Sequence, residues 1–174
     1  MTKVKYILIA LCGLFAVAGC MKEDRENTII GQEAAIDSYI SRFTDNKVER
    51  NGGSNRVVVE EAPESAAVAE AGDSLYVIYS GYVFSNGPGT LFVTNNPETA
   101  QARSFPLQET PMKMLLGGGN IVQGLEQGLY GVGEGEHSYI VFSAKYGFNN
   151  NVVGTIPKLA PMFYEIWVER VIKN

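Results

Sequence analysis

The stretch Gly119–Gly131, GNIVQGLEQGLYG, decides the fold because the hydrophobic period changes there from that of a strand to that of a helix. Asn120 stands where a helix N-cap is expected, and Gly131 stands where a glycine ends a helix. Apolar residues between them recur on one helix face: Ile121, Val122, Leu125 and Leu129. So short a helix is stable only when this face is buried against other elements.

Strand-like segments lie on both sides of this helix. They are rich in β-branched and aromatic residues, and they run over Ser74–Phe84, Leu91–Thr94, Met112–Leu116, Ser138–Ser143 and Met162–Val171. The last segment alternates between an apolar face and a wetter face that carries Phe163 and Trp167. Asn86–Gly89 has the composition of a hairpin turn. The pattern predicts an α+β fold in which an antiparallel half-barrel wraps around one short helix.

The N-terminus has the features of a secretory signal peptide. Lys3 and Lys5 precede an uncharged run, Tyr6–Gly19, which is shorter than the ~20 residues that span a bilayer. The run ends in Val17-Ala18-Gly19-Cys20, which resembles the lipobox of bacterial lipoproteins. We therefore expect cleavage after residue 19 and acylation of Cys20, which would anchor the chain to a membrane.

Three regions are expected along the chain. Residues 1–19 are the lipoprotein signal peptide. Residues 20–55 form a lipid-anchored tether with one short amphipathic helix over 29–43, whose apolar face should pack on its own domain rather than on a second copy. The glycine-rich stretch Asn51–Asn55 reads as a flexible break. A strand beginning at Val57–Val59 then opens the globular domain, residues 56–174.

Composition excludes several classes of function. The chain of 174 residues has 45% hydrophobic and 19% charged residues, which is typical of a globular protein. A net charge of −5 without a basic run argues against nucleic-acid binding. Two cysteines and one histidine are too few for a zinc site. No metal and no cofactor is expected.

No hydrolytic or phosphate-binding motif is present either. Gly117-Gly118-Gly119 lacks the Gly-Lys-Ser/Thr that would complete a phosphate loop, so we interpret it as a turn. His137 lies among Glu134 and Glu136, and these three residues are expected to be solvated.

Taken in order, the motifs resemble the FKBP family of peptidyl-prolyl isomerases. The matching pieces are Gly72–Gly81, Leu116-Gly117, Asn120–Leu129, Gly131–Glu134, Ala144–Gly147, Ile156-Pro157 and Met162–Val171. In this family an apolar pocket lies between the sheet and the helix. The resemblance implies catalytic roles for Tyr79, Phe92, Tyr146 and Tyr164. It implies substrate-binding roles for Met112, Met114, Ile121, Val122, Leu125 and Ile156. The Ile121 N–H and the Tyr146 hydroxyl would hold the peptide.

The sequence also departs from the family pattern. Val93 replaces a common acid, Leu125 replaces a common tryptophan, and Met112 stands where an aromatic residue is common. The polar segment Thr94–Thr110 is long, and the loop Phe148–Gly154 is unusual.

Two functions follow from these observations. The first is a lipid-anchored isomerase of the bacterial outer membrane, facing the periplasm or the cell surface, which acts on proline-containing peptides or unfolded envelope proteins. The second is a non-catalytic FKBP-like module that binds a peptide or protein in a degraded pocket. In either case we expect a monomer.

Overall fold

The computed structural model describes residues 23–174. The predicted signal peptide and the lipidation site Cys20 lie outside the described residues. Among residues 23–174, no helix combines the length and the apolar character needed to cross a bilayer.

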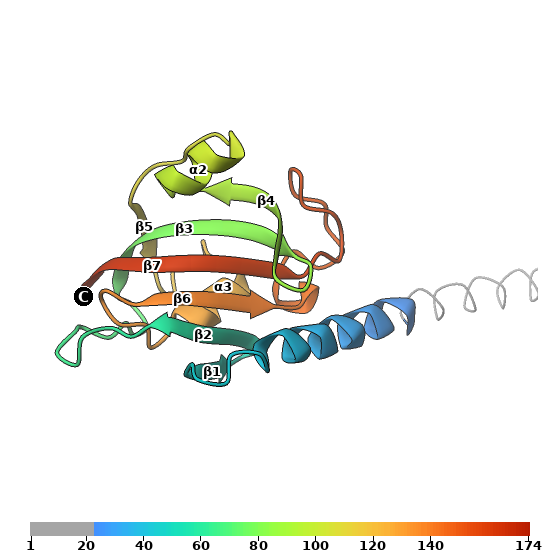
Figure 1. The fold of residues 1–174 in the computed structure, drawn as a ribbon, viewed down its shortest axis with the longest axis horizontal. Helices are drawn as coiled ribbons and strands as arrows, with labels where there is room; N and C mark the ends of the chain where they lie inside the picture. Colours follow the sequence, from blue (N-terminus) through green and yellow to red (C-terminus); the bar gives the residue numbers. More distant parts are fainter. Residues whose placement is uncertain (1–22) are drawn as a thin grey trace, which may run out of the picture.

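One antiparallel sheet of seven strands organises the fold. Its strands are β1 (Val48–Asn51), β2 (Ser54–Glu60), β3 (Ser74–Phe84), β4 (Pro88–Thr94), β5 (Met112–Leu115), β6 (His137–Phe142) and β7 (Met162–Ile172). Their order is β1-β2-β6-β7-β3-β4, and β5 pairs with the first part of β3 (Figure 1). The α+β prediction is confirmed, and the five predicted strands lie within a few residues of their expected bounds.

The predicted short helix is α3 (Gln123–Leu129), and it packs on the inner face of the sheet. Gly124 and Gly128 allow this close approach, because a Cβ at either position would lie 2.3 Å from Phe142 Cγ or 2.4 Å from Ile140 Cγ2. The predicted cap was wrong: Val122 is the N-cap residue, and no side chain caps this end. Gly131 follows the helix with φ +79°, which is a conformation that glycine adopts readily.

The N-terminal helix covers the opposite, outer face of the sheet. It spans residues 23–40 rather than 29–43, and a series of turns follows it. Its residues Ile36, Tyr39 and Ile40 are buried, and the Tyr39 ring lies edge-on to Phe84 and Phe163. The prediction that this helix packs on its own domain is confirmed, and it explains why Phe163 is buried on a face expected to be wetter.

The boundary predicted at residue 56 was wrong. Strands β1 and β2 form a hairpin across the stretch expected to be a flexible break, and Asn51 pairs with Ser54. Gly52 and Gly53 make the turn with positive φ angles of 54° and 85°. β2 then pairs with β6. The sheet therefore begins at Val48, within the segment that was expected to be a tether.

The long segment Thr94–Thr110 contains a helix that was not predicted, α2 (Pro97–Arg103). Asn96 caps it by accepting hydrogen bonds from the backbone N–H groups of Glu98 and Thr99. This helix lies beside β4, at the edge of the sheet (Figure 1).

Two groups expected to be solvated are buried. Glu136 is 6% exposed and forms an ion pair with Arg56 of β2, while Ser138 donates a second hydrogen bond to the same carboxylate. His137 stacks on Trp167 with ring centroids 4.6 Å apart, and its Nε2 lies 3.1 Å from Glu165 Oε1. The partners come from other strands, so local sequence did not reveal them.

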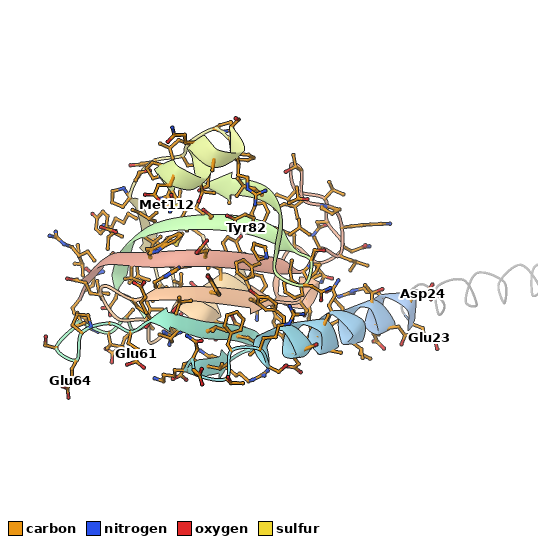
Figure 2. The ribbon with its side chains drawn as sticks, in the orientation of Figure 1. Glu23, Asp24, Glu61, Glu64, Tyr82 and Met112 are labelled. Carbon is orange, nitrogen blue, oxygen red and sulfur yellow. The ribbon has the colours of Figure 1, made fainter. Side chains whose placement is uncertain are left out.

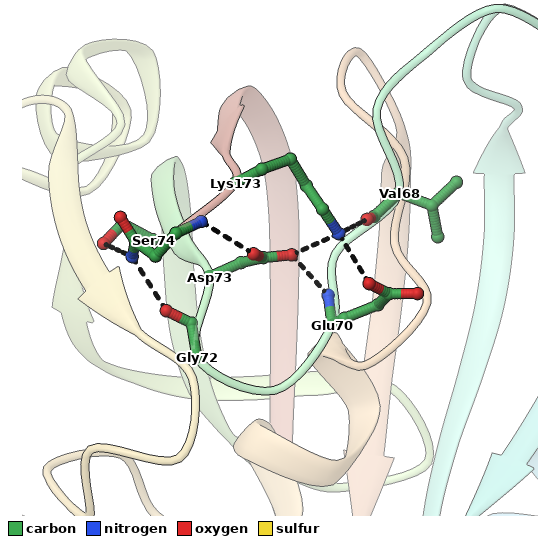
Figure 3. Close-up of polar contacts among 7 residues, drawn as sticks. Val68, Glu70, Gly72, Asp73, Ser74 and Lys173 are labelled. Carbon is green, nitrogen blue, oxygen red and sulfur yellow. Dashed lines mark hydrogen bonds and ion pairs between the residues drawn. The ribbon is translucent and has the colours of Figure 1, made fainter.

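Polar contacts hold the C-terminal end of β7 against the start of β3. Lys173 Nζ lies 2.7 Å from Asp73 Oδ2 and 2.8 Å from Glu70 Oε2, and it also donates to the Val68 carbonyl (Figure 3). Asn174 donates to the Gly72 carbonyl. These contacts lie at the strand ends that point away from the N-terminal helix (Figure 1).

Candidate functional site: an apolar cleft beside helix α3

A cleft of about 760 Å³ opens between the inner face of the sheet and the start of α3. Its lining residues come from β3, β4, β5 and β7, from the 94–110 segment, from α3 and the turn before it, and from the loop after β6. They are Tyr79, Val93, Glu109, Met112, Lys113, Met114, Leu115, Gly119, Asn120, Ile121, Val122, Leu125, Phe148 and Tyr164. This volume lies within the range of ~300–1,000 Å³ that is usual for pockets binding small ligands.

The structure brings together seven of the ten site residues predicted from sequence. These are Tyr79, Met112, Met114, Ile121, Val122, Leu125 and Tyr164. Met112, at the start of β5, lies on the α2 side of β3 (Figure 2). Leu125 is buried on the face of α3 that packs on the core, as the helical spacing predicted.

Phe92 lies next to the cleft rather than on its lining. Its ring meets the Tyr164 ring edge-on, with centroids 5.8 Å apart. It therefore supports the Tyr164 ring from β4. Ile156 is 5% exposed and belongs to the hydrophobic core. The expectation that these two residues line the cleft was wrong.

Tyr146 also lies elsewhere. Its ring covers Gly53 in the β1–β2 turn, where a Cβ would lie 2.0 Å from the ring. Tyr146 also lines a separate pocket together with Glu33 and Arg50. Phe148, two residues further along the chain, lines the cleft instead. The wall formed by this loop therefore has no hydroxyl, in contrast to what the resemblance implied.

Several lining residues were not predicted, and most of them have no distinctive sequence signal. Val93 follows Phe92 and occupies the position where an acid is common. Glu109 and Lys113 place one charge of each sign at the cleft, and Leu115 is 47% exposed beside them. The only available signal was the aromatic residue Phe148 at the start of an asparagine-rich loop.

The hydroxyls of two buried tyrosines are among the polar groups of the cleft. The rings of Tyr79 and Tyr164 have centroids 6.4 Å apart. Burial raises the pKa of Tyr79. Burial also raises the pKa of Tyr164, and the neighbouring Tyr79 raises it further. Both groups therefore stay protonated at neutral pH and can donate hydrogen bonds to a carbonyl.

The backbone around Tyr79 is fixed by a buried polar network. The Asn95 side chain accepts a hydrogen bond from the Tyr79 N–H and donates to the carbonyls of Val77 and Glu109. Thr94 Oγ1 donates to the Tyr79 carbonyl over 3.1 Å. Asn95 thus joins β3 to the end of the 94–110 segment, which places Glu109 at the cleft.

The turn before α3 offers a backbone donor. Within residues 23–174, the N–H of Ile121 forms no hydrogen bond to the protein. The same part of the chain contains no group of three His, Cys, Asp or Glu side chains suited to hold a metal ion. The cleft is thus equipped to bind an apolar ligand with one or two carbonyl groups, by burial and hydrogen bonding.

Comparison with known proteins identifies the family. A family model described as FKBP-type peptidyl-prolyl cis-trans isomerase matches residues 66–169. The chain belongs to this family. Its matched region contains every residue that lines the cleft, whereas β1, β2 and the N-terminal helix precede it.

Two characterised relatives share part of the sequence. Mouse FK506-binding protein 15 is 35% identical over 113 residues, which cover 63% of this chain and 8% of that protein. FK506-binding protein 1B of Aspergillus fumigatus is 23% identical over 100 residues, which cover 56% of this chain and 77% of that protein. The chain thus matches only a small part of the mouse relative.

Two solved structures share the fold. The structure of the three FKBP domains of wheat FKBP73 aligns with a TM-score of 0.61 at 18% identity, covering 74% of this chain and 52% of that one. FkpA from Escherichia coli aligns with a TM-score of 0.60 at 18% identity, covering 95% of this chain and 71% of that one. At this identity the likeness establishes the FKBP fold.

Proposed function

We propose that this FKBP-family protein catalyses rotation about X–Pro bonds, acting on proline-containing peptides or unfolded proteins of the bacterial cell envelope. The observation that carries the proposal is the open cleft, which is lined mostly by apolar residues and in which the side chains of Tyr79 and Tyr164 are buried. Family membership supports the same reaction.

The chemistry of the reaction suits such a cleft. Amide resonance maintains a rotation barrier of ~18–20 kcal/mol. The planar amide is more charge-separated than the twisted transition state, so transfer from water to an apolar site disfavours the planar form more. Every ~1.4 kcal/mol of this difference accelerates rotation tenfold. The reaction forms no covalent intermediate and needs no cofactor.

Each part of the cleft has a role in this scheme. Met112, Met114 and Leu125 surround the proline ring with apolar atoms. The Ile121 N–H and the tyrosine hydroxyls supply hydrogen bonds to the peptide carbonyls on either side of the ring. Phe148 covers the ring from the loop after β6. Bound in this way, the peptide is held by its ends while the amide between them rotates.

Exchange NMR on a tetrapeptide with leucine before proline tests the proposal. The protein should increase the cis–trans exchange rate, and FK506, after which the Aspergillus relative is named, should compete for the cleft. Exchange at the uncatalysed rate, under conditions in which the peptide demonstrably binds, would refute catalysis.

A second function has its own supporting observation. Val93 and Phe148 leave the cleft without the acid and the loop hydroxyl that the family resemblance implied. A cleft altered in this way suits a module that binds peptides without accelerating rotation. The same NMR experiment tests this alternative. Peptide binding without an increase in the cis–trans exchange rate would favour it.

We also propose that Cys20 is acylated and holds the protein at the outer membrane, facing either the periplasm or the cell surface. The support is the sequence Val17-Ala18-Gly19-Cys20. Mass spectrometry of the membrane-extracted protein should find residue 20 as an acylated N-terminus. A Cys20→Ser variant should lose the lipid and leave the membrane fraction. An unmodified cysteine in the membrane-extracted protein would contradict the anchor.

A further inference from the structure

The cleft wall at Phe148 belongs to a loop that connects β6 to β7, residues 143–161. Within the loop, the Asn149 N–H donates to the Ala144 carbonyl over 3.0 Å, and the Leu159 N–H donates to the Asn149 carbonyl over 2.6 Å. Ala144 and Leu159 therefore lie near each other on either side of Asn149, the residue next to Phe148.

Gln32 of the N-terminal helix joins these two positions. Its Oε1 accepts a hydrogen bond from the Ala144 N–H over 2.9 Å, and its Nε2 donates to the Leu159 carbonyl over 2.7 Å. A side-chain amide has one acceptor and one donor end, so a single glutamine satisfies both backbone groups at once. Next to it, Ser143 Oγ donates to Glu33 Oε1 over 3.2 Å.

The helix that carries Gln32 is itself firmly held. One turn further on, Ile36 is 1% exposed, and Tyr39 and Ile40 pack into the aromatic cluster on the outer face of the sheet. Gln32 therefore connects a fixed element to a loop whose middle residues, 150–155, are exposed. The helix lies outside the region that matches the FKBP family model.

We infer that Gln32 is a positioning residue for the cleft. By holding both ends of the loop, it places Phe148 at the cleft wall, and the N-terminal helix thereby becomes part of the binding site. The effect of Gln32 on ligand affinity rests on the proposed function. The effect of Gln32 on the position of the loop does not depend on it.

Two variants of Gln32 test the two hydrogen bonds, and a third variant serves as the control. Gln32→Ala removes both and favours the helix intrinsically. Gln32→Glu keeps an acceptor for the Ala144 N–H but cannot donate to the Leu159 carbonyl when ionised. Gln101→Ala, on the exposed side of α2, is the matched control. The measurements are amide hydrogen exchange, the NMR shifts of the Phe148 ring, and the affinity for the leucine–proline tetrapeptide.

In Gln32→Ala, exchange at Ala144, Asn149 and Leu159 should accelerate roughly tenfold, as the loss of one or two hydrogen bonds predicts. The Phe148 ring shifts should move and peptide affinity should fall roughly five- to tenfold. In Gln32→Glu, Ala144 should remain protected while Leu159 exchanges faster. Gln101→Ala should match the wild type throughout.

Unchanged exchange at Ala144 in Gln32→Ala would overturn the inference. So would a loosened loop that leaves the Phe148 shifts unaltered. If the wild type binds no proline peptide, the proposed function fails, while exchange and the Phe148 shifts still decide whether Gln32 positions the loop.

Discussion

Tyr79 on β3 and Tyr164 on β7 face the same cleft from paired strands, with ring centroids 6.4 Å apart. Strand alternation directs both side chains to the inner face of the sheet. The raised pKa values keep both hydroxyls protonated. The pair therefore adds two hydrogen-bond donors to the part of the cleft wall that the sheet forms.

Removing one of these hydroxyls should weaken ligand binding but preserve the fold. Tyr79→Phe and Tyr164→Phe should each lower peptide affinity about two- to tenfold, the effect of one hydrogen bond. Because a tyrosine ordinarily titrates near pH ~10 and both pKa values are raised, affinity should not vary through loss of these protons between about pH 6 and 9. Isothermal titration calorimetry at several pH values measures both the loss of affinity and its pH dependence. Tyr139→Phe, on the outer face of the sheet, is the control, and an equal loss of affinity in that variant would contradict a local role.

The loop after β6 provides a test between Phe148 and Tyr146. Phe148→Ala should weaken peptide binding by roughly tenfold or more, since it removes a large apolar side chain from the cleft wall. Tyr146→Phe should leave affinity unchanged, because this ring packs on the β1–β2 turn. Titration of both variants with the same tetrapeptide decides the matter. The reverse ranking would restore the role that the family resemblance implied for Tyr146.

The buried ion pair of Arg56 and Glu136 should be costly to break from one side. Glu136→Gln is expected to lower the free energy of unfolding by about 3–5 kcal/mol, because it leaves the guanidinium without a counter-charge. The double variant Arg56→Met with Glu136→Leu should lose less stability than the single variants Arg56→Met and Glu136→Leu lose together. Urea unfolding of the wild type and these three variants completes the cycle. Additive losses would contradict a coupled pair.

The contacts at the C-terminal end predict a specific dependence on acid (Figure 3). Hydrogen bonds from Lys173 and from the Glu70 N–H lower the pKa of Asp73. Because the pKa of Asp73 is lower in the folded protein than in the unfolded chain, the ionised carboxylate stabilises the fold at pH values above the unfolded-state pKa of ~3.9. This stabilisation is lost as the pH falls through the pKa of the folded state. The stability difference between the wild type and Asp73→Asn should therefore be constant above about pH 5 and shrink below about pH 3.

Urea unfolding between these pH values measures the Asp73 contribution. Lys173→Met removes the first cause of the lowered pKa and should reduce the acid dependence without abolishing it. Parallel stability curves for the wild type and Asp73→Asn would contradict the lowered pKa.

Local patterns predicted α3 and every strand except β1, because an alternating or helical spacing can be recognised without the rest of the chain. Alternation along β7 and the stripe ending at Leu129 required no knowledge of the rest of the chain. The helix α2 was missed although Asn96 and Pro97 are a recognisable start signal. The hairpin at Gly52 was not predicted, because glycine-rich turns and flexible linkers have the same composition.

Most of the cleft residues on β3, β5, α3 and β7 were predicted, whereas the wall formed by the loop after β6 was assigned to the wrong residue. The roles of Tyr79, Leu125 and Tyr164 were implied by the family resemblance, and these three residues lie on β3, α3 and β7, whose positions the local patterns had predicted. Phe148 lies in a loop whose path depends on Gln32, more than 100 residues earlier in the chain. Likewise, the burial of Glu136 depends on Arg56, 80 residues away. Neither pairing has a signal in a single sequence.

The most direct test of the central claim is the cis–trans exchange rate of the leucine–proline tetrapeptide, measured by NMR with the wild type and with Phe148→Ala at saturating peptide. We predict that the wild type accelerates exchange and that Phe148→Ala reduces the acceleration by roughly tenfold, because it opens the apolar wall to water. Exchange at the uncatalysed rate with peptide bound to the wild type would contradict catalysis in the cleft. Equal acceleration by both proteins would contradict the role of Phe148 in the cleft wall.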